Sequence, residues 1–177
     1  MQAKRIVAKC GRASMKLLDS VGQAFDRGID DGEVTLDDLF DRNHRPIEGT
    51  DPTQYLTRGT EFYERVVREA QNWSLDAHEE IYISVCVNDH GYAPAHMEKY
   101  SQPQRPDDRD WNLANARNRM IFDDRVGMAA AKSTDPFLLQ IYRRDMGNGK
   151  FALMKSLSAP IFCKGRHWGC VRLGYDA

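Results

Sequence analysis

The segment from residue 137 to residue 175 constrains the fold most, because it reads as three strands joined by two tight turns. FLLQIYRRD (137–145), KFALMKSLSAPIFC (150–163) and HWGCVRLGY (167–175) are strand-like, and the turns MGNGK and KGRH between them carry glycine. Glycine readily adopts the positive φ that hairpin turns require. The segment therefore predicts a meander of three antiparallel strands, with no helix between 151 and 175.

Two further strands are expected earlier in the chain. In IYISVCVND (81–89) apolar residues alternate, with Ile81, Ile83, Val85 and Val87 on one face. The turn Asp89-His90-Gly91 leads into AHMEKYS (95–101), which reads as a second, more polar strand. A loop over 103–109 and a crossover that starts as a helix over 110–125 follow. The sequence thus predicts five antiparallel strands.

The first 75 residues read as helical. A stripe from Met15 to Phe25 has helical spacing, Thr35 with Asp38 forms a capping box, and Asp51-Pro52 has the pattern of a helix start. At 177 residues the chain has the size of one domain. We therefore predict a single α+β domain over 1–177, in which a helical segment (1–75) packs on a sheet core (80–177).

Charge and composition exclude several classes of protein. The chain has 25 basic and 26 acidic residues, a balance that argues against a nucleic-acid partner. No apolar stretch is long enough to span a membrane. The four cysteines, Cys10, Cys86, Cys163 and Cys170, have no metal-site spacing. We interpret them as reduced thiols, which favours a cytoplasmic location; the alternative is an extracytoplasmic sensor domain of a membrane receptor.

Five stretches of the chain resemble a sensor domain of bacterial methyl-accepting chemotaxis proteins. They are LDDLFDRNHRPIEGTDPTQYLTR (36–58), DHGYAPAHMEKYSQPQ (89–104), NRMIFDDRVGMAAA (118–131), PFLLQIYRRDMGNGKFALMKSLSAPI (136–161) and KGRHWGCVRLGY (164–175). The resemblance implies a five-stranded PAS/Cache-like ligand sensor. It also implies a homodimer and a coiled-coil signalling domain in the full-length receptor. The chain lacks the long heptads of that coiled coil, so we expect an isolated sensor domain or a freestanding relative.

The crossover DWNLANARNRMIFDDR (110–125) gathers amides and guanidiniums beside an apolar pair. In the fold that the resemblance implies, the crossover lines the pocket. We therefore predict a ligand site bounded by Trp111, Arg117, Arg119 and Tyr142, with a small carboxylate as the guest. The alternative is a solvated connector whose arginines pair with Asp123 and Asp124. On the last strand, period-two alternation places Trp168, Cys170 and Arg172 on one face.

Other kinds of site find little support in the sequence. None of the five histidines has the spacing of a metal ligand pair, so no metal site is predicted, and the cofactor is left unknown. A non-covalent haem held by His96 or His167 stays an alternative. No catalytic motif is present, and we expect no enzyme. The second functional hypothesis is a dimerisation module without a ligand, in which the stripe from Met15 to Phe25 forms the seam between two copies.

Overall fold

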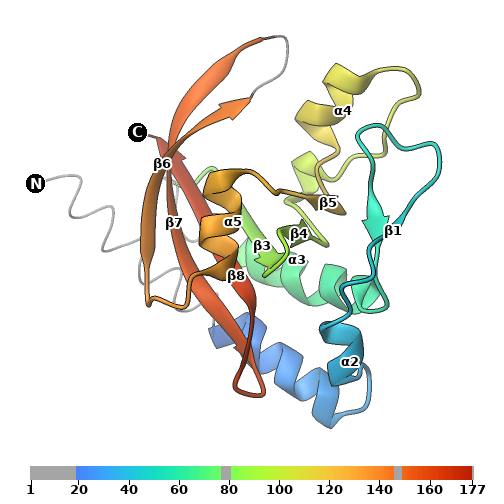
Figure 1. Cartoon of the computed structure of the whole chain (residues 1–177), viewed down its shortest axis with the longest axis vertical. Helices are drawn as coiled ribbons and strands as arrows, with labels where there is room; N and C mark the ends of the chain where they lie inside the picture. The colour runs from blue at the N-terminus through green and yellow to red at the C-terminus, as the bar shows by residue number, and fades with distance from the viewer. Residues whose placement is uncertain (1–18, 77–80, 146–148, 177) are drawn as a thin grey trace, which may run out of the picture.

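The computed structural model describes residues 19–76, 81–145 and 149–176 (Figure 1). Residues 19–30 are helical, and Met15, Leu17 and Leu18 of the predicted stripe, like Cys10, lie outside the described residues. The further elements, in chain order, are α2 (Leu36–Leu39), β1 (Arg45–Pro46), β2 (Tyr55–Leu56), α3 (Thr60–Asp76), β3 (Ile83–Asn88), β4 (Tyr92–Ala93), a 3-10 helix (Glu98–Tyr100), α4 (Arg109–Asn115), β5 (Met120–Ile121), α5 (Arg125–Lys132), β6 (Leu138–Asp145), β7 (Phe151–Cys163) and β8 (Arg166–Asp176).

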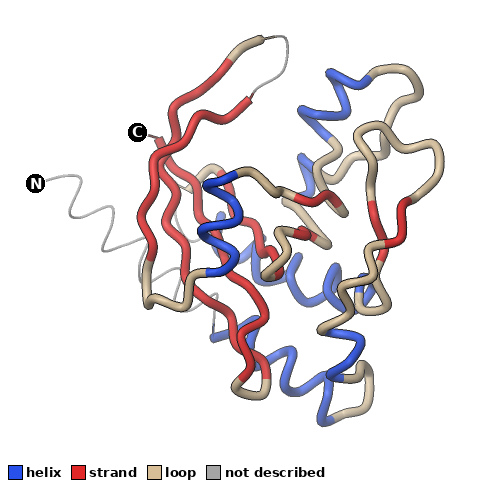
Figure 2. Tube along the Cα trace, viewed as in Figure 1, coloured by secondary structure: helices blue, strands red, loops and turns tan. Residues whose placement is uncertain are grey.

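The main sheet has four antiparallel strands in the order β3-β8-β7-β6. Strands β6, β7 and β8 form the predicted meander, with Leu139 opposite Leu157 and Ser158 opposite Arg172. Gly149 and Gly165, in the two turns, have φ of 70° and 74°. The α+β class and the antiparallel meander are thus confirmed (Figure 2).

The predicted fifth strand is wrong, because residues 95–101 do not join the sheet. After Asn88 the chain turns sharply, since the Asn88 side-chain oxygen accepts hydrogen bonds from the backbone N–H groups of His90 and Tyr92. From there it bonds to the crossover instead: β4 pairs with β5, and the carbonyl of Tyr100 accepts from the N–H of Arg117 at 2.7 Å. These contacts between distant segments satisfy the backbone groups that a sheet would otherwise pair.

The helix expected to start at Asp51-Pro52 is also wrong in its position. Tyr55 and Leu56 form β2, which pairs with β1, and the N–H of Tyr55 donates to the carbonyl of Arg119. Helix α3 begins only at Thr60, whose hydroxyl oxygen accepts from the N–H of Thr57 at 2.7 Å. The capping box at Thr35 is confirmed, because its hydroxyl oxygen accepts from the N–H of Asp38 and donates to that carboxylate.

Two apolar clusters lie on opposite faces of the sheet. On one face, helix 19–30 and α3 pack against β7 and β8, and Val21 and Phe25 of the predicted stripe are fully buried there. On the other face, α5 and the segment around Met97 pack against Ile83, Val85 and Val87 of β3. The stripe residues that the structure describes therefore serve the core of their own domain.

The predicted alternation of the last strand is wrong at Trp168, which does not share a face with Cys170 and Arg172. Trp168 belongs to the cluster under the helices, whereas Cys170 belongs to the opposite cluster. The pairing of β7 with β8 shifts register between Ile161 and Phe162, so that His167 faces Phe162 and Gly169 faces Ile161. Trp168 is the extra residue of this β-bulge, which turns its side chain to the other face.

Candidate functional site

A small cavity of about 80 Å³ lies on the sheet face that α5 covers. Its floor comes from all four strands of the sheet, and its opposite wall comes from the loop after β4 and from the crossover. The floor residues are Ile83, Val85, Tyr142, Ser156, Arg172 and Gly174, and the wall residues are His96, Arg117, Phe122 and Asp124. Hydrophobic side chains with a few converging polar groups are typical of small-molecule sites.

Arg172 is the most unusual residue of this cavity. It stands between the buried Val171 and Leu173 on a central strand, and its guanidinium carbon lies 5.7 Å from the centre of the Tyr142 ring. Its Nε is buried and has no hydrogen-bond partner within the described part of the chain. A buried donor without a partner costs free energy, about 1–3 kcal/mol for a typical group and more for a charged one.

Two further unpaired polar atoms belong to the same face of the sheet. Ser158 lies directly opposite Arg172 in the pairing of β7 with β8, and Gln140 lies directly opposite Ser156 in the pairing of β6 with β7. The Ser158 hydroxyl and the Gln140 side-chain oxygen are both buried and, like Arg172 Nε, lack a partner among the described residues. Of these three atoms, only Arg172 Nε belongs to a residue that lines the cavity; Ser158 and Gln140 are register neighbours of the lining residues Arg172 and Ser156.

The wall adds a second guanidinium and a carboxylate. Arg117 Nη1 donates to the carbonyl of Leu113 at 2.8 Å, and its guanidinium carbon lies 5.2 Å from the centre of the Phe122 ring. Asp124 caps α5, because its Oδ1 accepts from the N–H groups of Val126 and Gly127 at 3.0 Å. With two arginines against one carboxylate that is engaged by the helix, the charged groups lining the cavity favour an anion.

His96 is the histidine of the cavity wall. It is 3% exposed, and its Nδ1 accepts a hydrogen bond from the N–H of Met97 at 2.8 Å. Its Nδ1 therefore carries no proton in this arrangement. The cavity of about 80 Å³ that His96 lines is smaller than a porphyrin. Among the residues that the structure describes, no group of three or more histidine, cysteine and acidic side chains is placed to hold a metal ion.

The cavity unites two of the four residues named from the sequence, Arg117 and Tyr142. Arg119 lies elsewhere: its Nε and Nη2 bind the two carboxylate oxygens of Glu64 at 2.6 and 2.9 Å. This hydrogen-bonded pair raises the pKa of Arg119. Trp111, on α4, is stacked by Arg105, whose guanidinium carbon lies 3.8 Å from the centre of the indole ring. Neither Trp111 nor Arg119 lines the cavity.

Sequence reasoning missed Arg172, Ser156, His96 and Asp124 as cavity residues. For Arg172 a signal was available, since it is the one charged residue in the apolar run CVRLGY (170–175). It was assigned to the face of Trp168 because a bulge cannot be seen in an alternating pattern. His96 and Asp124 carry no comparable signal, because contacts between distant segments bring them to the cavity.

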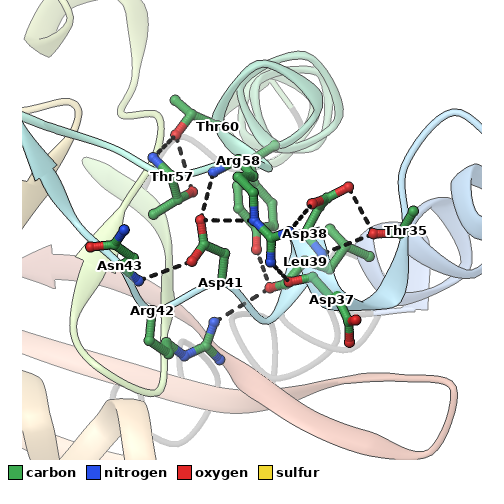
Figure 3. Close-up of polar contacts among 11 residues, drawn as sticks. Thr35, Asp37, Asp38, Leu39, Asp41, Arg42, Asn43, Thr57, Arg58 and Thr60 are labelled. Atoms are coloured by element: carbon green, nitrogen blue, oxygen red, sulfur yellow. Dashed lines mark hydrogen bonds and ion pairs between the residues drawn. The ribbon is translucent and has the colours of Figure 1, made fainter.

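A second polar cluster, at the junction of α2 and α3, is structural (Figure 3). Asp41 accepts from the N–H groups of Arg58 and Asn43, and Arg58 also pairs with Asp38 at 3.2 Å. Burial raises the pKa of the Asp41 carboxyl, but the two N–H donors and the nearby Arg58 outweigh burial, so the net shift is downward. The carbonyl of Leu39 accepts from the indole Nε1 of Trp168 at 3.1 Å.

Comparison with known proteins adds one distant likeness. No family model matches the chain, and no curated protein matches it. Among solved structures it is similar to one described as "Methyl-accepting Chemotaxis protein X", with 14% identity and a TM-score of 0.44. The match covers 98% of this chain and 59% of that chain, so this chain spans less than two thirds of that protein's length.

Proposed function

We propose that this chain is the ligand-sensing input domain of a bacterial chemotaxis receptor and that it binds a small anionic molecule in the cavity of Arg117 and Arg172. The sequence resemblance of 36–58, 89–104, 118–131, 136–161 and 164–175 supports the receptor role. The buried, unpartnered Nε of Arg172 is the observation that carries the ligand site. A receptor of this kind passes the change on binding to an attached helix and signalling domain.

The chemistry of the cavity favours a small carboxylate. Guanidinium groups bind planar oxyanions through paired hydrogen bonds, and Arg172 and Arg117 approach the cavity from the sheet and from the crossover. A volume of about 80 Å³ admits a guest of only a few non-hydrogen atoms, of the size of formate, acetate or glycolate. We propose no catalytic role for these groups.

The same segment that binds the guest also leads into α5. Phe122 and Asp124 line the cavity, and α5 begins at Arg125 and packs Ala130 and Ala131 on the sheet. A guest held between Arg172 and Arg117 would therefore change the contacts between the crossover and β8 at the first turn of α5. Coupling of this kind needs a difference in contacts between the free and bound states. We propose that this difference arises at the junction of the crossover and α5.

The location and assembly of the domain are part of the same proposal. Cys86, Cys163 and Cys170 are free, buried thiols; burial raises the pKa of Cys170 to about 12. Free thiols suit the reducing cytoplasm. Within the described residues no helix is long and apolar enough to cross a membrane. A homodimer stays a prediction, and a seam on the N-terminal helix would have to use residues other than the buried Val21 and Phe25.

Calorimetric titration of a panel of small carboxylates tests the ligand site. We expect binding of at least one of formate, acetate or glycolate. The variant Arg172→Gln should weaken that binding by about 2–5 kcal/mol, the range for a buried charge pair that loses one partner. Arg105→Gln is the matched control, because Arg105 is exposed and stacks on Trp111 away from the cavity. Absence of binding across the panel, or equal binding by Arg172→Gln, refutes the site.

A further inference from the structure

An exposed apolar patch covers one face of the β6–β7 hairpin. Its members are large hydrophobic side chains with exposed fractions between 42% and 60%, namely Phe137, Leu139, Ile141, Phe151 and Leu153, and we call them the hairpin patch. The pairing of β6 with β7 places them on one side, since Leu139 lies opposite the core residue Leu157 and Arg143 lies opposite Leu153. Contiguous exposed apolar surface of this kind marks an interaction site.

The hairpin patch continues the face that the helices cover elsewhere. Leu157 of β7 belongs to the cluster under helix 19–30 and α3, and Leu139 beside it is 52% exposed. The upper parts of β6 and β7 extend past α5 in Figure 1. No described helix packs on the patch, so this part of the sheet face is apolar and is not covered by any helix among the described residues.

The charged residues around the patch indicate what kind of partner would bind there. Arg143 and Lys155 lie on the same face, and the Arg143 guanidinium carbon is 4.4 Å from the centre of the Phe151 ring. The register also places Asp145, opposite Phe151, on this face, whereas Arg144, opposite Ala152, belongs to the other face. With Lys150 in the turn, the patch side of the hairpin has three basic residues and one acidic residue. A complementary surface is therefore apolar along its centre and acidic along its flanks.

Two occupants from the chain itself fit this charge poorly. A second copy placed on the patch with two-fold symmetry would present the same excess of basic over acidic residues, so the two patches would carry like net charge. Residues 1–18 contain Lys4, Arg5, Lys9, Arg12 and Lys16 and no acidic residue. We propose that the hairpin patch is the docking surface for an acidic amphipathic helix of another protein or of another domain. Such a helix would lay its apolar face on Leu139, Ile141 and Leu153 and its carboxylates near Arg143 and Lys155.

Fluorescence anisotropy with two synthetic peptides tests this proposal. One peptide is an amphipathic helix with leucine on one face and glutamate along both flanks, and the other carries lysine in place of each glutamate. We expect the acidic peptide to bind at least about tenfold tighter than the basic one, and its affinity to fall as salt is added. Ile141→Glu should weaken it by at least about tenfold, and Leu153→Glu gives an independent second disruption.

A variant outside the patch serves as the control for the peptide experiment. Phe162→Glu changes a side chain of similar exposure, 41%, at the other end of β7, and it should leave peptide binding unchanged. Circular dichroism verifies that each variant is folded. Three results overturn the proposal: no preference for the acidic peptide, a wild-type dimer in sedimentation that Ile141→Glu dissociates, or binding to anionic phosphatidylserine vesicles that the same variant abolishes.

Discussion

Ser158 and Arg172 lie opposite each other on β7 and β8, and each has a buried polar atom without a partner within the described part of the chain. Neighbouring strands usually place apolar pairs at such positions in a core. An unpaired hydroxyl beside an unpaired guanidinium nitrogen, of which only the guanidinium belongs to a cavity-lining residue, is costly for the fold alone. The cost is understandable if a polar guest completes the hydrogen bonds, which links the packing of this sheet to ligand binding.

Ser158→Ala tests how much the unpaired hydroxyl lowers the free energy of unfolding. Because the hydroxyl is buried and unpaired, its removal should leave the free energy of unfolding of the ligand-free protein unchanged or raise it by up to about 1 kcal/mol. Urea denaturation measures this. Ser101→Ala is the control: its hydroxyl donates to the carbonyl of His96 at 2.9 Å, so its loss should destabilise by about 1 kcal/mol. A large loss of stability in Ser158→Ala would show that its hydroxyl has a partner.

We expect Arg119 to stabilise the fold and to make no contribution to ligand affinity. Its side chain makes two hydrogen bonds to Glu64, and both groups are largely shielded, with 31% and 19% of their side chains exposed. Glu64→Gln removes the charge partner and should lower the free energy of unfolding by about 1–3 kcal/mol. The affinity for a carboxylate should stay within about twofold of the unaltered protein. If Glu64→Gln lost affinity for the carboxylate while its stability stayed unchanged, Arg119 would belong to the ligand site.

Gly169 is required where β8 passes β3 at the bulge. A Cβ at this position would lie 2.0 Å from the carbonyl oxygen of Val87 and 2.5 Å from Cα of Asn88, both backbone atoms that cannot move independently. Gly169→Ala should therefore cost several kcal/mol, on the order of 2–4, or prevent folding. Gly149→Ala is the comparison, since it meets nothing within 4 Å and has only a positive φ of 70° to oppose it. It should cost about 1 kcal/mol in thermal or urea denaturation.

Local sequence patterns made the meander predictable. The position of β2 and the partners of the predicted site residues depend on long-range contacts, which the sequence pattern does not show. Strands β6 to β8 alternate and are joined by glycine turns, so neighbours in sequence are neighbours in the sheet. The pattern at Asp51-Pro52 is equally local, but Tyr55 bonds to Arg119, and this contact places the residues in β2 rather than in a helix. For the site, residue type indicated Arg117 and Tyr142; only the fold showed that Arg119 has Glu64 as its partner and that Trp111 has Arg105.

Asp41 predicts how stability depends on pH. Its carboxyl is 9% exposed, and although burial alone would raise its pKa, the N–H groups of Arg58 and Asn43 and the charge of Arg58 bring it below the ordinary 3.8. A group whose pKa is lower in the folded state than in the unfolded state stabilises the fold above its unfolded pKa. The contribution is lost as pH falls from about 4 through the folded pKa, because the unfolded state then binds the proton more readily.

Asp41→Asn should therefore lower the free energy of unfolding at pH 7 by about 0.5–1.5 kcal/mol, a modest value because Arg58 is more than half exposed. The difference between variant and unaltered protein should stay constant above about pH 5 and shrink as pH falls below 4. Urea denaturation at a series of pH values measures it. Asp37→Asn, which changes an exposed acidic residue of the adjacent helix α2, serves as the control and should show a much smaller difference at pH 7. A difference for Asp41→Asn that grows on acidification would contradict the assigned contacts, because it would mean that the Asp41 carboxyl is easier to protonate in the folded state.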